Sequence, residues 1–416
     1  MDIYHAPAQA NVGGTSSRAP RPAGGSARGG CSWVSLAGRF PALRRADWPA
    51  LVVTVVAGIL TGRNLIAIVQ FIQRRPLEGD FALYYVFARI GLHHGWGSLY
   101  DLNAQRQEWQ ALGPTLFYPE IYTPPVAWLV APFALLPFSV AIALWTVLLL
   151  VALAVTWWLC VPEYRWPVRG MHLAIAGAVP VVAFGLLLGQ VVVLVAAAVA
   201  GSWWLVQRGH PFIAGLSLSL IALKPQLAFL VPLTILAGGR RRMFLGWLTG
   251  SAGILAVCLM TLGPSGLATY GSRLYQATQS LDSFVVPVRL TLAGLLGQGL
   301  LAHAAQVAVT VITLAVCWRR RSAGPEFPIA AGITASLLAT PFVHAQDLAI
   351  LLPAAWLSLR SGWRPFERTL GLTGYLASLV LFTPLPLLLL MLGWLPGRVA
   401  VPAGVARPRT DLAEAG

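Results

Sequence analysis

Asp80 is one of a few polar residues that stand among apolar residues in this chain of 416 residues. It stands in the stretch "GDFALYY", beside aromatic and apolar residues that would exclude water from its carboxylate. Desolvation raises the pKa of a carboxyl toward the range in which it can act as a general base. The alternative is that Asp80 caps the helix that follows, because Asp accepts amide hydrogen bonds at helix starts. Glu78 is expected to be a solvated neighbour.

Lys224 is the only lysine among the 29 basic residues of the chain, and it lies in the apolar stretch "ALKPQL". The proline that follows it bends a helix and leaves a backbone carbonyl without its usual partner. A compact ammonium at such a break indicates a phosphate or carboxylate partner. The alternative is an ion pair with a buried Asp that only holds helices together.

Four more polar residues are candidates for substrate binding. His344 and Asp347 are three residues apart, so on a helix they share a face. They can contact a substrate or orient Asp80, or Asp347 can cap a helix start beside an interfacial histidine. Gln190 falls at a predicted turn in "LLGQVV", and Arg63 interrupts the first apolar run. Arg63 can bind a lipid phosphate or extend its charge to the membrane interface.

No metal or cofactor site is expected. His93 and His94 are adjacent rather than at helical ligand spacing, which indicates an interfacial loop, and the sequence has no HExxH or DxD motif. The four cysteines have no paired spacing, so neither a disulfide framework nor a thiolate metal site is indicated. The charged residues of a second predicted external loop can contact a substrate head group, but they are expected to be solvated: Arg273, Asp282 and Arg289.

The composition of the chain indicates a membrane protein. Hydrophobic residues make up 57% of the chain and charged residues 10%, against about 25% charge in a soluble domain. The mean hydropathy is +0.71. Apolar runs that approach the roughly 20 residues of a spanning helix recur along the chain. They lie near 48–72, 124–160, 171–188, 190–206, 212–237, 243–262, 300–317, 327–340, 348–359, 369–382 and 384–396. We therefore expect an all-α polytopic membrane protein.

The net charge of +15 comes from arginines in short clusters between apolar runs rather than from one basic face. This pattern is typical of cytoplasmic loops and not of nucleic-acid binding. The clusters are Arg44 and Arg45, Arg240 to Arg242, Arg319 to Arg321, and Arg360, Arg364 and Arg368. With these inside, the first span carries Asp80 to the outer face, and residues 73–122 form a large external loop.

Two topologies fit residues 124–240. If 124–137 is a re-entrant or broken start of the helix that ends near Cys160, every arginine cluster lies inside, and Gln190 and Lys224 lie at external turns. In the competing topology 212–237 is a single span that buries Lys224 at mid-membrane. The first topology is preferred because it obeys the positive-inside rule throughout.

Both chain ends are expected to be disordered tails around one transmembrane domain, residues 47–398. Residues 1–46 are rich in Gly, Pro, Ser, Ala and Arg and lack the pattern of a cleavable signal peptide, so they are expected to be a cytoplasmic tail. Residues 399–416 have a similar composition.

The order of several motifs resembles glycosyltransferase family 87, within the GT-C superfamily of membrane enzymes. The motifs are "GDFALYYVFARIGLHHGWGSLYD", "YTPPVAWLVAPFALLPFSVAIALW", "LLGQVVVLVAAA", "IAGLSLSLIALKPQLAFLVPL" and "ATPFVHAQDLAILLPA". The likeness spans roughly residues 48–360 and rests on the order and spacing of the motifs. It implies a GT-C-type bundle of about 10–12 transmembrane helices with a large first external loop.

The resemblance also implies a hexosyltransferase of the cell (plasma) membrane. Such enzymes take a sugar, typically mannose, from a polyprenyl-phosphate donor at the outer face, without a cofactor. An Asp in the first external loop is their expected general base, and Asp80 matches that position. It would deprotonate a hydroxyl of a glycolipid or glycan acceptor, which attacks the anomeric carbon with inversion. Lys224 and Arg63 would stabilise the phosphate by charge, while His344 would hold donor or acceptor.

A transporter or flippase of a lipid-linked or anionic substrate is the main alternative, because intramembrane charges and broken helices are equally natural there. Such proteins commonly contain internal repeats, and the long loop 73–122 has no counterpart in the second half of the sequence. A transferase for another lipid-linked sugar, such as arabinose or glucose, is a nearer alternative.

Overall fold

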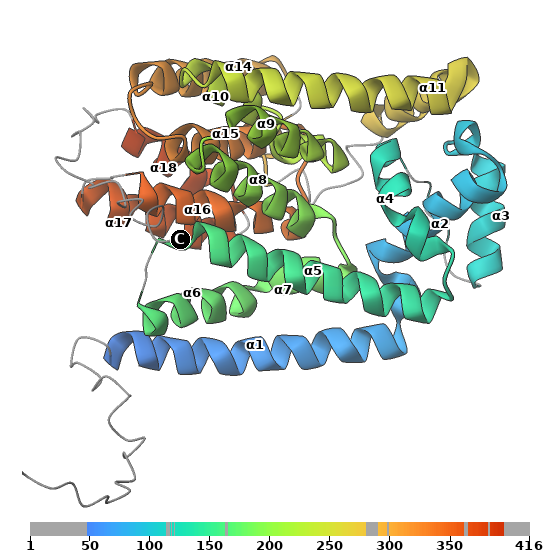
Figure 1. The fold of residues 1–416 in the computed structure, drawn as a ribbon, viewed down its shortest axis with the longest axis horizontal. Coiled ribbons are helices and arrows are strands. Elements are labelled where there is room, and N and C mark those ends of the chain that lie inside the picture. The colour runs from blue at the N-terminus through green and yellow to red at the C-terminus, as the bar shows by residue number, and fades with distance from the viewer. Residues whose placement is uncertain are drawn as a thin grey trace, which may run out of the picture. The chain divides into compact units, whose positions relative to one another are not determined.

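The computed structural model describes residues 48–394, apart from positions 114–116, 118, 120, 163–164, 280–289, 298, 362–364 and 382. Every regular element in this part of the chain is a helix (Figure 1), which confirms the predicted all-α fold. The two predicted tails, together with Asp282 and Arg289, lie outside the described residues.

The helices, with 3₁₀ segments labelled η, follow one another in this order: α1 (Trp48–Arg74), η3 (Pro76–Glu78), α2 (Asp80–His93), η4 (Trp96–Ser98), α3 (Leu102–Leu112), α4 (Pro124–Ala134), α5 (Phe138–Cys160), α6 (Trp166–Ala178), α7 (Pro180–Leu188), α8 (Val192–Gln207), α9 (Pro211–Leu218), η5 (Ser219–Leu223), η6 (Pro225–Leu227), α10 (Val231–Ala237), α11 (Arg241–Gln279), α13 (Leu292–Leu296), α14 (Leu300–Arg319), α15 (Glu326–Ala339), η8 (Ala345–Ile350), α16 (Leu351–Arg360), α17 (Pro365–Leu381) and α18 (Leu385–Trp394).

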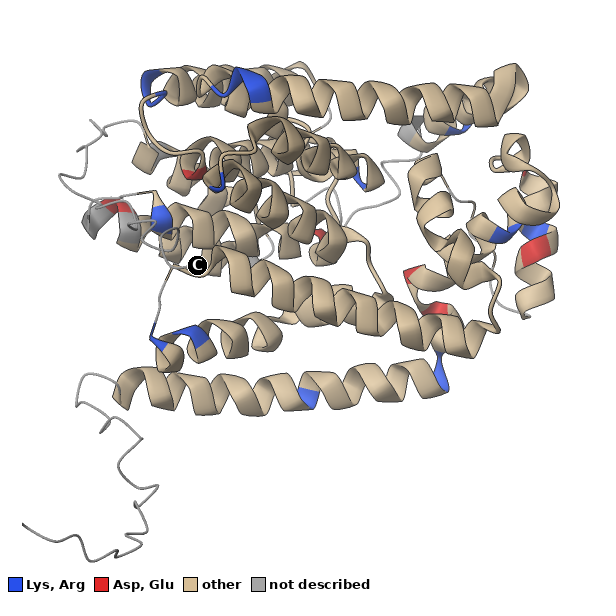
Figure 2. Cartoon of the chain, in the orientation of Figure 1, with Lys and Arg blue, Asp and Glu red and all other residues tan. Residues whose placement is uncertain are grey.

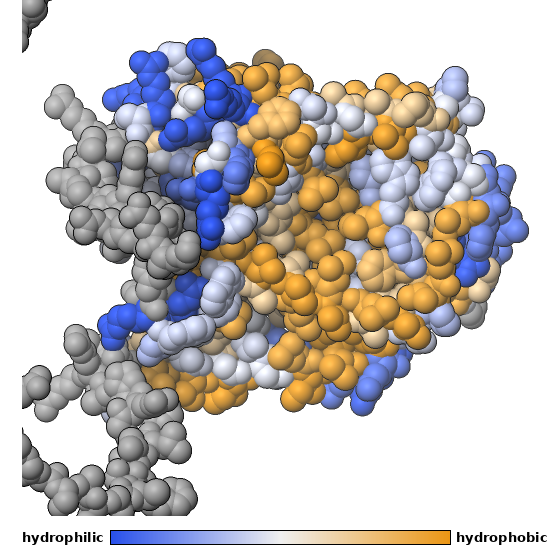
Figure 3. All heavy atoms as spheres, in the orientation of Figure 1, coloured by the Kyte–Doolittle hydropathy of each residue, from blue (hydrophilic) through white to orange (hydrophobic). Residues whose placement is uncertain are grey.

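Several of these helices are long and apolar enough to cross a membrane. Among the described residues they are α1, α5, α11 and α14, and the bent pair α6–α7 makes a fifth if it is one span. The shorter helices α4, α8, α9 with η5, and α15 are also apolar. Helix α1 exposes a row of large apolar side chains, such as Val52, Ile59 and Ile66. Figure 3 shows the apolar surface as an orange belt between hydrophilic ends. The chain is a polytopic membrane protein, as predicted.

Prolines divide two of the predicted spans. The run 124–160 is two helices, α4 and α5, with Pro137 immediately before the second. The run 171–188 bends by 62° between α6 and α7, where Pro180 follows Val179. A residue before proline avoids the helical conformation and proline lacks an amide donor, so a straight helix cannot continue through either position.

The run 212–237 forms a hairpin with two short legs rather than one straight span. Helix α9 begins beside the start of α11, and at Gly215 and Gly246 the two backbones are in direct contact. Helix α10 ends a few residues before α11 begins. The chain therefore leaves and returns at one end of α11, and Lys224 lies at the far end of the hairpin. Lys224 thus lies at a turn, as in the preferred topology, and the membrane face of that turn stays a prediction.

Arginine side chains gather at one end of the bundle and bind the carbonyl groups that end α5. Arg360 Nε donates to the Cys160 oxygen at 2.7 Å, and Arg169 Nη2 donates to the Trp158 oxygen at 3.0 Å. Helix C-termini carry unpaired carbonyls and a partial negative charge, so cations are stabilising there. Figure 2 shows further basic residues at the same end, near the starts of α6 and α11 and the end of α14.

At the opposite end, α2 and α3 are joined by a cluster around Glu108 of α3. Arg89 Nε donates to Glu108 Oε2 at 2.7 Å, and ring nitrogens of His93 and His94 lie 2.9 and 3.0 Å from Oε1. Burial alone would raise the pKa of Glu108, but its hydrogen bonds to His93 and Arg89 prevail and lower it. The histidine pair, predicted to lie in an interfacial loop, instead ends α2 and fastens it to α3.

Replacing Gly246 by alanine is expected to destabilise the protein, because a Cβ there would lie 2.0 Å from the Phe212 carbonyl oxygen of α9. Overpacking of this kind costs typically about 1–3 kcal/mol. Gly253→Ala on the same helix is the matched control, since nothing lies within 4 Å of the added Cβ. The midpoint of thermal unfolding should fall only for Gly246→Ala, and equal midpoints would contradict the packing of α9 on α11.

Candidate functional site

Asp80 is the first residue of α2 and lies beside the turn between α7 and α8. The helix cap is Gly79, and the Asp80 side chain makes no capping hydrogen bond. Its carboxylate instead accepts a hydrogen bond from Gln190 Nε2. The residue is partly exposed. The carboxylate is therefore held by Gln190 in a residue that stays partly exposed, which differs from the capping interpretation.

A left-handed glycine sets Gln190 in place. Helix α7 ends at Gly189, whose φ of 76° is a conformation that side chains other than glycine rarely adopt. The Gln190 amide then donates to the Gly185 carbonyl at 2.8 Å. Trp145 Nε1 donates to the Gly189 carbonyl, also at 2.8 Å. The turn is thus fixed from both sides, and Gln190 is only 1% exposed.

Lys224 occupies the turn between η5 and η6. It precedes Pro225 and has a non-helical backbone, with φ −151° and ψ 75°, as the restriction before proline requires. Its side chain is 3% exposed, and Nζ donates to Asp347 Oδ1 at 2.5 Å and to Gln190 Oε1 at 2.9 Å. An unpaired ammonium at this depth would carry a large desolvation penalty, so Asp347 is the partner that permits its burial.

Asp347 and His344 come from the segment that precedes α16. Asp347 is fully buried, and its Oδ2 accepts a hydrogen bond from the His344 backbone amide at 3.1 Å. It therefore caps the start of η8 in addition to pairing with Lys224. The His344 Nδ1 atom lies 3.6 Å from the same oxygen, and the imidazole is 39% exposed. His344 is thus the second accessible side chain of the group.

The hydrogen bonds determine which way the Gln190 amide faces. Lys224 is only a donor, so Gln190 must present its oxygen there and turn its NH₂ group to the Asp80 carboxylate, which is an acceptor. The Tyr84 hydroxyl donates to the same oxygen at 2.9 Å and reinforces this orientation. A continuous polar path results, with a buried centre and two accessible ends. We use "polar path" for Asp80, Gln190, Lys224, Asp347 and His344.

Aromatic side chains surround the Asp80 end of the polar path. Phe81 is fully buried and stacks on Trp145 with the ring centroids 5.3 Å apart. Burial raises the pKa of Asp80 because it disfavours the charged form, while the charge of Lys224 and the hydrogen bond from Gln190 offset only part of this effect. An accessible carboxylate with a raised pKa is suited to accept a proton from a bound hydroxyl.

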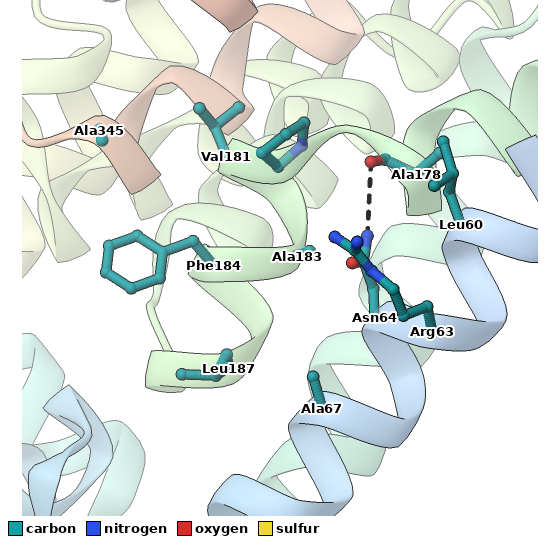
Figure 4. A pocket seen from close by; sticks show the side chains of 11 residues that line it. Leu60, Arg63, Asn64, Ala67, Ala178, Val181, Ala183, Phe184, Leu187 and Ala345 are labelled. Atoms are coloured by element: carbon teal, nitrogen blue, oxygen red, sulfur yellow. Dashed lines mark hydrogen bonds between the residues drawn. The ribbon is translucent and has the colours of Figure 1, made fainter.

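Arg63 stands apart from the polar path. It lies within α1 and lines a cavity of ≈ 410 Å³ whose other walls come mainly from α7 (Figure 4). Ala345, the neighbour of His344, lines the same cavity. The structure thus brings five of the six predicted site residues into one network and places the sixth in an adjoining cavity.

Tyr84 belongs to the site but was not among the predicted residues. It is four residues after Asp80 in α2, so helical spacing puts both side chains on one face. That spacing is a usable signal only once the helix is known to begin at Asp80. The Tyr84 ring also packs edge-on against Tyr122, with the centroids 4.7 Å apart.

In the part of the chain that the structure describes, no group of three or more His, Cys, Asp or Glu side chains could hold a metal ion. Both carboxylates of the polar path bind donors of the protein itself: Asp80 accepts from Gln190, and Asp347 accepts from Lys224.

The sequence profile of glycosyltransferase family 87 matches residues 121–343, more than half of the 416-residue chain. No curated protein and no solved structure matches the chain. The matched segment contains Gln190 and Lys224, whereas Asp80 and His344 lie outside it. The match confirms the resemblance carried by the motifs, and the chain belongs to glycosyltransferase family 87.

Proposed function

We propose that the protein transfers a hexose, mannose in the typical case, from a polyprenyl-phosphate donor to a glycolipid or glycan at the outer face of the cell membrane. Family membership makes it a membrane glycosyltransferase, and the donor, the acceptor and the membrane face are the proposal. One observation carries it: the carboxylate of the partly exposed Asp80, at the start of α2, is held by Gln190, which the buried Lys224–Asp347 pair fixes in turn. Family membership also favours transfer over transport.

Asp80 acts as the general base in this proposal. It removes the proton from the acceptor hydroxyl while the hydroxyl oxygen attacks the anomeric carbon of the sugar. The bond from that carbon to the phosphate oxygen breaks, and polyprenyl phosphate leaves with the electron pair. Because the attack comes from the face opposite the leaving group, the configuration inverts. Gln190 holds the carboxylate in position through its amide.

Lys224 and Asp347 act as positioning residues rather than as direct ligands. The Lys224 ammonium is buried and already binds two acceptors, so it fixes Gln190 and through it Asp80. The ion pair with Asp347 is neutral overall, so Lys224 influences the reaction through the position that it gives to Gln190. His344, with an exposed imidazole, is the member of the polar path that contacts donor or acceptor.

Asp80→Asn is expected to lower the transfer rate by about 10²–10⁴-fold, because the amide keeps the size of the side chain but cannot accept the proton. Glu78→Gln is the matched control: this neighbouring carboxylate is 57% exposed and pairs only with Arg75 on the surface. Transfer is measured with purified protein and a radiolabelled polyprenyl-phosphate hexose. Normal turnover by folded Asp80→Asn protein would contradict the assignment.

Lys224→Met should destabilise the protein by about 3–5 kcal/mol, because it leaves the buried Asp347 carboxylate unpaired. Removing both charges, in Lys224→Met with Asp347→Leu, should restore much of the thermal stability but not the transfer rate. Arg75→Met breaks an exposed ion pair and should alter stability by at most about 1 kcal/mol. Full activity in the double variant would leave the pair with a purely structural role.

Cysteine labelling tests the membrane face of the site. In a background without the four native cysteines, Gln107→Cys on α3 should react with a membrane-impermeant thiol reagent on intact cells. Arg242→Cys at the start of α11 should react only after permeabilisation. Both positions are exposed in the structure, so a lack of access would reflect the membrane and not burial. The reverse pattern would place the polar path on the cytoplasmic side.

A further inference from the structure

We infer that the cavity between α1 and α7 binds the phosphate and the adjoining isoprenoid units of the donor lipid, with Arg63 as the cation for the phosphate. The inference rests on the proposed function and adds a binding site to it. Helix α1 lies outside the residues that match the family profile.

The cavity opens where a tight helix contact ends. Helices α1 and α6 approach so closely that a Cβ at Gly177 would lie 2.5 Å from Thr61 Cγ2. The Thr61 hydroxyl donates to the Ala174 carbonyl at 2.8 Å. Beyond Val179 the chain bends by 62° into α7. Because α7 is bent away from α6, helix α1 cannot pack closely along both, and the space that remains between α1 and α7 is the cavity.

One cation faces this space from otherwise apolar walls. Figure 4 shows the Arg63 side chain directed from α1 toward Ala183 of α7. The neighbouring Asn64 amide is engaged elsewhere, since it donates to the Gly177 and Ala178 carbonyls at 2.9 and 3.4 Å. The remaining wall residues are apolar, such as Phe184.

The chemistry of the cavity points to a lipid phosphate. In the described part of the chain, Arg63 forms no ion pair with a carboxylate. An arginine within a membrane-spanning helix is costly unless it is paired, reaches water or binds an anion. Its planar guanidinium binds phosphate through two parallel hydrogen bonds. A cation with apolar walls fits an anionic headgroup followed by a hydrocarbon chain.

The cavity extends from Arg63 toward the polar path. Leu187 and Ala345 line it; Leu187 is three residues before Gln190, and Ala345 directly follows His344. Phe71, eight residues and about 12 Å along α1 from Arg63, lies against Gly79, which precedes Asp80. A phosphate held by Arg63 would therefore place its sugar toward the two accessible ends of the polar path.

Binding of a radiolabelled long-chain polyprenyl phosphate to the purified full-length protein tests the inference without catalysis. Arg63→Gln should weaken binding about 10- to 100-fold, as expected for a lost charged hydrogen-bond partner, and Arg63→Lys should weaken it less. Arg74→Gln, at the exposed end of the same helix, should bind normally. Unchanged binding by Arg63→Gln would mean that Arg63 only extends to the interface and would overturn the inference.

A second variant addresses the cavity itself. Ala183→Trp should fill the space and weaken binding, whereas Val56→Trp on the exposed face of α1 should not. Unlabelled polyprenyl phosphate should compete with the probe, and the corresponding polyprenyl alcohol should not. Equal competition by phosphatidate would overturn the assignment to an isoprenoid lipid.

The same assay separates this inference from the proposed function. Asp80→Asn should bind the probe like the unmodified protein, because its defect lies in proton transfer. If Arg63→Gln and Ala183→Trp bind the probe normally while the unmodified protein transfers sugar, the cavity assignment fails and the proposed function stands. If the variants lose binding but the unmodified protein transfers sugar from no polyprenyl-phosphate donor, the proposed function fails.

Discussion

A buried ammonium must be paired, and the pairing of Lys224 with Asp347 organises the end of the bundle that carries Asp80. The two residues come from distant segments, the tip of the α9–α10 hairpin and the segment before α16. Gln190, from a third segment, accepts a hydrogen bond from the same ammonium. Each segment departs from regular α-helix where it supplies its group: a proline follows Lys224, a left-handed glycine precedes Gln190, and Asp347 caps its own helical turn.

This arrangement separates the rigid and the reactive parts of the site. The buried centre of the polar path satisfies its own charges, so it can hold Asp80 without help from a ligand. The Asp80 carboxylate accepts one hydrogen bond, from Gln190, and the residue remains partly exposed. Since α2 is capped by Gly79 and not by this side chain, the carboxylate is free for chemistry without loss of the helix. In the proposed role of Asp80 as the general base, a carboxylate that is fixed before substrate arrives needs little reorganisation during the reaction.

Local features of the sequence were sufficient to predict much of this structure. Hydropathy predicted the apolar helices, Pro225 predicted the break at Lys224, and the arginine clusters predicted which ends lie together. The pairing of Lys224 with an aspartate was one of two interpretations, and spacing along the chain could not identify the partner as Asp347. Tyr84 and the bridging role of Gln190 also depend on contacts between distant segments. Hydropathy likewise predicted the helix that contains Arg63 but not the surroundings of its side chain. These depend on the contact of Thr61 with Gly177 and on the bend after Val179.

The chain has a single lysine among its 29 basic residues, and the arginines at the far end of the bundle show a structural reason for this bias. The Arg360 guanidinium binds the Cys160 and Val161 carbonyls at 2.7 and 2.6 Å while it lies over the Trp203 ring at 4.7 Å. A lysine cannot make this set of contacts, because it lacks the planar fork of donors and the flat face. An exchange of Arg for Lys would therefore keep the positive charge at this end of the bundle but lose the joint between helices. The flat guanidinium of Arg360 thus joins helix ends, whereas the compact ammonium of Lys224 fits between the acceptors of Asp347 and Gln190.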